Sequence, residues 1–121
     1  MTATETTIAE LDEAQVRVDL AAAFRLAARM DLHESVSNHF SATVSADGRR
    51  FLCNPRWRHF GLVTASELLL LDVDDPSTMD RPDAPDPSAW CIHGAIHARI
   101  PTARAVLHCH PPNATAMCSL V

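Results

Sequence analysis

Four of the seven histidines lie between residues 88 and 110, and their spacing could hold a metal ion. His108 and His110 are two residues apart in a segment, 105–110, whose alternation of residue types predicts a strand. Side chains two apart on a strand point to the same side, so both imidazoles can reach one point. Histidine nitrogens are ligands that zinc prefers. The pair predicts a metal site, and the alternative is two histidines on a solvated strand face.

Two predicted elements flank this pair. His93 and His97 are four residues apart in a helix-like segment, which places both on one helical face. Pro101 ends that segment because it cannot donate the next helical hydrogen bond. After the strand, the prolines at 111–112 stop the extended chain, and Asn113 stands where the N-cap of another helix is expected. The pair is thus predicted at the C-terminal end of a strand facing a helix start, where α/β folds commonly place their sites.

Upstream elements have to position these histidines. Apolar residues at helical spacing predict an amphipathic helix over 12–30. Alternation and turn residues predict strands at 40–44, 50–54 and 68–71, the first two joined as a hairpin. Residues 64–67 have a capping-box pattern, and the aspartate- and proline-rich residues 73–87 predict a solvated loop. His39 lies beside the first strand, where a lone histidine is more often structural than a ligand or a base.

Composition excludes several classes of function. A length of 121 residues suits one domain, and no apolar run is long enough to cross a membrane. The acidic N-terminus is not a secretory signal, so we expect a cytoplasmic protein with reduced cysteines and a flexible segment at 1–11. A net charge of −5 gives no reason to expect nucleic-acid binding. All ten basic residues are arginine, which excludes Schiff-base chemistry on a lysine.

Two stretches, PSAWCIH and ARIPTARAVLHCHPPNATAMCSL, resemble the N-terminal part of the class II aldolase/adducin domain. The order of motifs matches from about Val16 to the last residue. The resemblance implies an α/β fold with a central, largely antiparallel sheet flanked by helices. It also implies that residues 12–121 are the N-terminal part of a domain that is truncated at its C-terminus.

The same resemblance implies a metal-dependent lyase that acts on a small hydroxy-carbonyl or sugar-derived substrate. The reaction would pass through an enediolate stabilised by a histidine-bound divalent ion, with zinc the first choice. His108 and His110 would be the metal ligands, and His93 would either support a ligand from behind or be a third ligand. Three residues match family positions that contact substrate: Asn38, Ser41 and Ser88. Arg56 stands where the family has small residues that cradle a phosphate, and an arginine can still grip an anionic group there; the alternative is a surface loop. A homo-oligomer, a tetramer in the family, is also expected.

Departures from the family pattern leave a second function open. Ala89 stands where family aldolases carry the glutamate that acts as general base, and a methyl group cannot accept a proton. The third metal histidine and a tyrosine donor are also absent. The alternative is therefore a non-catalytic, adducin-like scaffold or assembly domain, and a plain α/β domain whose histidines have no special role is a third possibility. We expect the helix start to tolerate a glutamate at position 89, because a negative charge suits a helix N-terminus.

Overall fold

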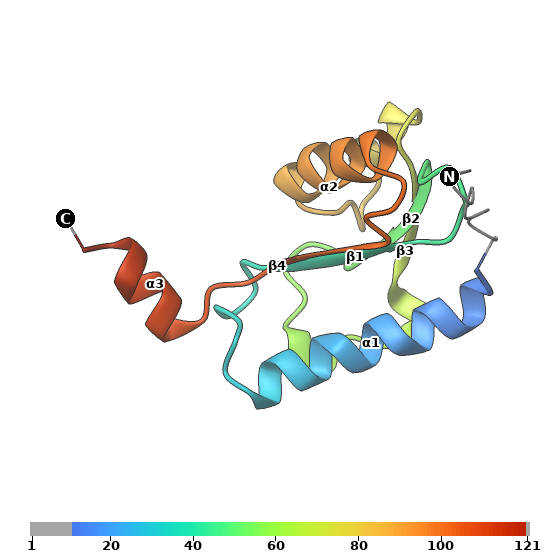
Figure 1. The fold of residues 1–121 in the computed structure, drawn as a ribbon. Coiled ribbons are helices and arrows are strands. Elements are labelled where there is room, and N and C mark those ends of the chain that lie inside the picture. Colours follow the sequence, from blue (N-terminus) through green and yellow to red (C-terminus); the bar gives the residue numbers. More distant parts are fainter. Residues whose placement is uncertain (1–10, 121) are drawn as a thin grey trace, which may run out of the picture.

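The chain folds as a four-stranded antiparallel sheet with helices on both faces (Figure 1). The computed structural model describes residues 11–120, so the predicted flexible segment lies almost wholly outside the described residues. In chain order the helices and strands are α1 (Glu13–Arg29), β1 (His39–Thr43), β2 (Arg50–Cys53), β3 (Leu69–Asp72), α2 (Pro87–Arg99), β4 (Ala105–His108) and α3 (Pro112–Cys118). The strand order is β3-β2-β1-β4, and every neighbouring pair is antiparallel. The predicted fold class is confirmed.

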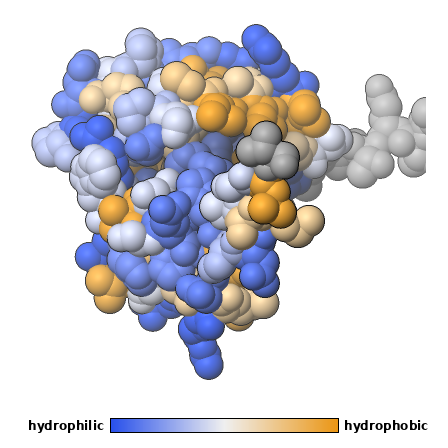
Figure 2. Space-filling model, turned by 90° about the vertical axis from the view of Figure 1, so that its left-hand side faces the viewer, coloured by the Kyte–Doolittle hydropathy of each residue, from blue (hydrophilic) through white to orange (hydrophobic). Residues whose placement is uncertain are grey.

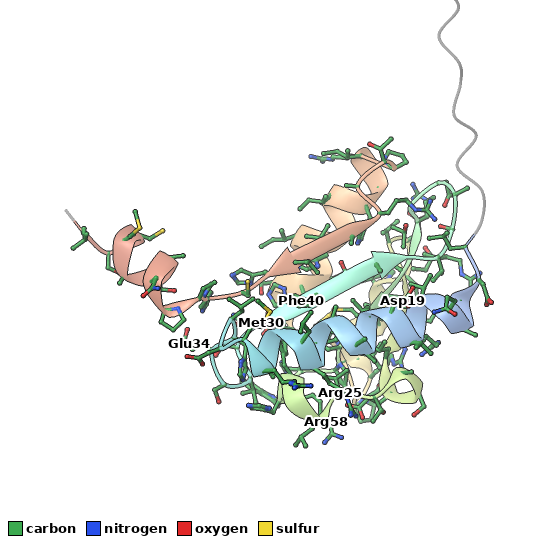
Figure 3. The ribbon with its side chains drawn as sticks, turned by 60° about the horizontal axis from the view of Figure 1, so that its bottom comes forward. Asp19, Arg25, Met30, Glu34, Phe40 and Arg58 are labelled. Atoms are coloured by element: carbon green, nitrogen blue, oxygen red, sulfur yellow. The ribbon has the colours of Figure 1, made fainter. Side chains whose placement is uncertain are left out.

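Helix α1 covers one face of the sheet (Figure 1). Its N-cap, Asp12, accepts a hydrogen bond from the Ala14 amide at 3.0 Å, which satisfies a backbone donor that the helix itself leaves unpaired. The face toward the sheet buries Phe24 completely, and its ring lies 5.0 Å from that of Phe40 and 4.6 Å from that of Phe60. Figure 3 shows Phe40 between α1 and β1. The helix predicted from apolar spacing is therefore confirmed to within a residue at each end.

Strand β1 divides its side chains between the two helices. Phe40 packs in the α1 cluster, and successive strand residues point to opposite faces. His39, Ser41 and Thr43 therefore face α2, and all three are buried because α2 covers that side. Polar groups buried in this way need hydrogen-bond partners. For His39 and Ser41 those partners come from α2 itself.

Helix α2 lies on the opposite face of the sheet from α1 (Figure 1). Asp86 caps it by accepting from the Ser88 amide at 2.8 Å, and Pro87 occupies the first turn. The buried face of α2 carries Ala89, His93, Gly94 and His97. Ala89 is 1% exposed and belongs to an apolar cluster with Phe51, Cys53, Leu69 and Leu71. This burial argues against the expectation that a glutamate is tolerated at 89, because its carboxylate would lie among apolar groups.

Two connecting segments differ from their predictions. In the 64–67 turn, the Thr64 hydroxyl donates to Glu67 Oε2 at 2.8 Å, and its side chain makes no capping bond to the backbone. The 73–87 segment is only partly solvated, since it contains the 3₁₀ helix Pro76–Asp80 and buries Thr78, Ala84 and Pro85. The Ala84 carbonyl accepts from the Arg56 amide at 3.2 Å, which holds this segment against the neighbouring loop.

Helix α3 projects away from the rest of the fold (Figure 1). It begins at Pro112 with Pro111 as its N-cap, so the prediction that Asn113 caps it is wrong. Proline is well tolerated at the first helical position because its missing N–H would be unpaired there anyway. Figure 2 faces this end of the molecule and shows a mostly hydrophilic surface with apolar patches. Among the described residues, none of the helices has the length and apolar character needed to span a membrane.

Candidate metal centre

The sheet register places the end of β4 against the start of β1. His39 pairs with His108, and the ladder stops there because β1 begins at His39. The predicted strand over 105–110 is therefore correct only as far as His108, and His110 lies just beyond it. The two rings nevertheless meet, with Nε2 of His108 3.0 Å from Nε2 of His110. The predicted convergence of this pair is present in the fold.

The second ring nitrogen of each histidine has its own partner. His110 Nδ1 lies 2.6 Å from Glu34 Oε2, and His108 Nδ1 lies 3.2 Å from His39 Nε2. Figure 3 shows Glu34 beyond the end of α1, near the segment that joins β4 to α3. Both Nδ1 atoms are thus occupied, and the two Nε2 atoms face each other. Sequence reasoning missed Glu34, because a residue 76 positions away from its partner gives no local signal.

Behind His39, a hydrogen-bonded chain runs into the core. His39 Nδ1 lies 2.8 Å from His93 Nε2, and His93 Nδ1 lies 2.7 Å from Ser41 Oγ. The same hydroxyl is 2.7 Å from His97 Nε2, and His97 Nδ1 is 2.9 Å from the Ala103 carbonyl oxygen. We call the series Ala103, His97, Ser41, His93, His39 and His108 the histidine chain. It joins the two histidine pairs of the sequence into one network.

The histidines of this chain are neutral at pH 7. Burial, with the neighbouring His39 and His97, lowers the pKa of His93 to about 3. Burial also lowers the pKa of His97 and, together with nearby His108, that of His39. The pKa of His108 is lowered by burial and by His110. Each of these four side chains therefore presents one N–H and one lone pair.

The unfolding free energy of the metal-free protein should fall as the pH is lowered from 7 to 5.5. His93 has a folded pKa of about 3 and an ordinary value of 6.5, so below pH 6.5 the unfolded chain binds a proton that the folded chain does not. The loss should approach about 1.4 kcal/mol per pH unit from this group. Urea denaturation in the presence of EDTA at pH 7 and at pH 5.5 measures this difference in unfolding free energy.

Between pH 7 and 5.5 the unfolding free energy responds to histidines and not to carboxylates. Asp47, Glu67 and Asp74 have lowered pKa values, but their ordinary values of 3.8 to 4.5 confine their effects to more acidic solutions. His93→Gln should show a shallower fall between pH 7 and 5.5 than the parent. An unchanged unfolding free energy across this window in the parent would contradict a neutral, buried His93.

The remaining predicted site residues have different surroundings. Asn38 Oδ1 accepts from the Glu34 amide at 2.7 Å, and its buried Nδ2 has no hydrogen-bond partner among the described residues. The exposed Ser88 has its Oγ 3.1 Å from His39 Nε2 and donates to Asp86. Arg56 is exposed, with its guanidinium carbon 5.4 Å from the Trp57 ring centroid. Ser88 therefore lies at the histidine chain, Asn38 holds the segment that carries Glu34, and Arg56 belongs to a surface loop.

Within the described residues, the candidate metal centre is limited to the side chains of His108 and His110. Among residues 11–120, no group of three or more histidine, cysteine, aspartate or glutamate side chains is arranged to hold one. His39 and His93 are close to the pair, but their ring nitrogens are directed at each other and at their neighbours in the histidine chain. The candidate centre thus consists of the facing Nε2 atoms of His108 and His110, whose Nδ1 atoms contact His39 and Glu34.

Comparison with known proteins agrees with this arrangement of elements. The family profile described as Class II Aldolase and Adducin N-terminal domain matches residues 18–121. The chain belongs to the class II aldolase/adducin family. The "Putative aldolase class 2 protein" of Caulobacter vibrioides is 35% identical to it over 105 residues, which are 87% of this chain and 41% of the relative.

Other members of the class II aldolase/adducin family resemble the chain in the same region. An adducin-related protein of Schizosaccharomyces pombe is 33% identical over 112 residues, covering 88% of this chain and 35% of that protein. The crystal structure of an aldolase II superfamily protein from Pseudomonas syringae has a TM-score of 0.76 at 36% identity, covering 89% of this chain and 43% of that one. The chain therefore spans about two fifths of the length of these relatives.

Proposed function

We propose that this chain contributes to a metal-dependent, aldolase-like lyase, and that His108 and His110 bind a divalent cation, with zinc the first candidate. The observation that carries the proposal is the approach of the two Nε2 atoms to 3.0 Å while both Nδ1 atoms are used elsewhere. Zinc–nitrogen bonds are about 2.0–2.1 Å long, so two nitrogens at this separation can both reach one ion.

The chemistry of the donors fits a cation. The Glu34 carboxylate can only accept, so His110 Nδ1 donates to it, and a neutral His110 then presents a lone pair at Nε2. A carboxylate behind a histidine is the usual arrangement at zinc sites, where it fixes the ring and makes the ligand nitrogen more basic. Glu34 therefore supports His110 as a ligand. His39 occupies the corresponding position behind His108.

Of the two roles expected for His93, its contacts favour support of the site over direct ligation of the metal. Both of its ring nitrogens are within hydrogen-bond distance of buried partners, His39 on one side and Ser41 on the other. A third ligand would need a free nitrogen directed at the pair. We therefore propose that His93 supports the site from behind His39.

A bound divalent cation would polarise the carbonyl group of a substrate. Two protein ligands leave other coordination positions open to substrate oxygens. We propose a small hydroxy-carbonyl or sugar-derived substrate, contacted by the exposed Ser88 beside His39. Asn38 is buried and its Oδ1 accepts from the Glu34 amide, which favours a supporting role for Asn38. Arg56, which can grip a carboxylate or phosphate with two parallel hydrogen bonds, would bind an anionic group. Ser41 is fully buried between two histidines, which favours a supporting role over contact with substrate.

The alternative function is a non-catalytic, adducin-like assembly domain. Ala89 is packed among apolar side chains and offers no carboxylate, and one relative is an adducin-related protein. Under either function we propose a cytoplasmic location, as the N-terminal sequence predicts, and a homo-oligomer, as the family resemblance implies. The two functions differ in what a bound metal would do: in the lyase it acts on substrate, and in the assembly domain it contributes at most to stability.

Metal titration followed by an activity assay tests the lyase. The purified chain, stripped with EDTA, is titrated with zinc by calorimetry and then supplied with a panel of short hydroxy-carbonyl compounds and sugar acids, each with and without phosphate. We expect saturable binding of one ion per chain and release of a carbonyl product that requires the metal. Zinc binding without product from any compound would favour the assembly domain, and absence of zinc binding would overturn the proposed site.

A further inference from the structure

We propose that the histidine chain is directional, and that it holds His108 in the tautomer whose Nε2 is a free lone pair. His97, Ser41, His93 and His39 are then positioning residues, which act on a metal only through His108. The inference rests on the proposed metal site, but the hydrogen-bond directions are a property of the metal-free chain. They follow from the backbone carbonyl at the buried end.

The Ala103 carbonyl oxygen fixes the first two hydrogen bonds. A carbonyl can only accept, so His97 Nδ1, 2.9 Å away, must carry the proton. A neutral His97 then has a lone pair at Nε2, which is 2.7 Å from Ser41 Oγ. The single hydroxyl proton of Ser41 therefore points to His97. The Ser41 oxygen is left as an acceptor for its other neighbour.

The same reasoning carries the direction out to the surface. His93 Nδ1 is 2.7 Å from Ser41 Oγ and has to donate to it, which leaves a lone pair at His93 Nε2. That lone pair accepts from His39 Nδ1 at 2.8 Å, so His39 Nε2 is an acceptor in turn. His108 Nδ1, 3.2 Å away, donates to it. Ser88 Oγ is 3.1 Å from the same nitrogen, and in this direction its one hydroxyl proton is shared between His39 Nε2 and Asp86. His108 Nε2 is thereby left without a proton.

At the outer end, with His110 neutral, two lone pairs then face each other. Glu34 holds the His110 proton at Nδ1 and the histidine chain leaves His108 Nε2 without a proton, and the two Nε2 atoms are 3.0 Å apart. Neutral imidazoles in this state cannot hydrogen-bond to each other, so either a metal cation or a proton is the partner that satisfies both. Because the series ends on a carbonyl, which cannot pass a proton on, it serves to orient a ligand and not to conduct protons.

A second pair of histidines shows the opposite arrangement. His33 Nε2 and His59 Nε2 are 2.9 Å apart, a separation close to that of the proposed ligands. The Gly61 amide donates to His59 Nδ1 at 3.0 Å, so His59 carries its proton at Nε2 and donates it to His33. This pair is an ordinary hydrogen bond and needs no cation. It provides an internal reference for the tautomers.

Nitrogen-15 NMR of the histidine rings tests the directions in the metal-free parent protein. Each neutral ring shows which nitrogen carries the proton. We expect the Nδ1–H form for His39, His93, His97 and His108, and the Nε2–H form for His59. An Nε2–H form, or a doubly protonated ring, at His39 or His93 at pH 7.5 would overturn the inference. The hydrogen bonds of the histidine chain would then run in the opposite direction or be interrupted.

Two substitutions on the same face of β1 separate positioning from folding. Ser41→Ala removes the hydroxyl that links His93 to His97, and we expect zinc affinity to fall about 10- to 100-fold, as for other losses behind a metal ligand. His93 should also lose its single Nδ1–H form in the spectrum. Thr43→Val is the control, since the buried Thr43 hydroxyl has no hydrogen-bond partner among the described residues. It should leave both zinc affinity and the ring signals unchanged.

The outcomes of the two proposals are distinguishable. The expected ring signals in a parent chain that binds no zinc would uphold the histidine chain and reject the metal site. Zinc bound by the parent with equal affinity in Ser41→Ala would uphold the site and reject the positioning role. If Ser41→Ala does not fold, the signals of the parent protein still decide the directions.

Discussion

Replacing His108 and His110 together with alanine should abolish zinc binding and leave the fold intact. Both rings lie at the edge of the sheet, where His108 is exposed and His110 follows the last paired residue of β4. Their removal takes away both proposed ligand nitrogens, so the loss should exceed the 10- to 100-fold typical of changes behind a ligand. Zinc content after equilibrium dialysis, measured by elemental analysis, gives the stoichiometry, and circular dichroism checks the fold.

The matched control is the double variant His33→Ala/His59→Ala. It removes a second pair of rings whose Nε2 atoms approach to 2.9 Å, and it should retain the zinc of the parent. These two rings are linked by a hydrogen bond that the Gly61 amide orients. Equal loss of zinc in both double variants would show that the metal is held nonspecifically by surface histidines.

Gly48→Ala should destabilise the fold by about 2–5 kcal/mol, because backbone strain and a steric clash act together. Gly48 has φ +74° in the turn between β1 and β2, in the left-handed region that glycine favours. A Cβ at this position would lie 2.2 Å from the carbonyl oxygen of His97, a backbone atom near the end of α2. The turn therefore packs directly under the helix that carries two members of the histidine chain. The unfolding free energy from urea denaturation, measured at pH 7.5, gives the effect.

Gly94→Ala is the control for that measurement. Gly94 lies within α2, and an added Cβ would meet Val73 and Phe51 at 3.6 and 3.8 Å, ordinary contact distances. Alanine is favoured over glycine inside a helix by roughly 0.5–1 kcal/mol, so this variant should be slightly more stable than the parent. Similar unfolding free energies for the two variants would mean that the turn does not pack against His97.

Features with a local physical cause were predicted correctly from the sequence. Apolar spacing located α1, and alternation located the hairpin of β1 and β2, because each pattern follows from the period of one element. The convergence of His108 and His110 was predicted from a separation of two residues, and the shared face of His93 and His97 from a separation of four. Residue types alone also excluded chemistry that requires a lysine.

Only the tertiary structure decided what lies behind each of the two proposed ligands. Glu34 and His39 reach the pair from segments 76 and 69 residues away, through the end of α1 and the register of β1 on β4. Ser41 and Ala89 acquired their surroundings when α2 docked on the sheet: one lies between two histidines and the other in an apolar cluster. Sequence spacing specifies which side chains share a face within one element. Which faces meet, and so which nitrogen of a histidine keeps its lone pair, depends on how separate elements pack.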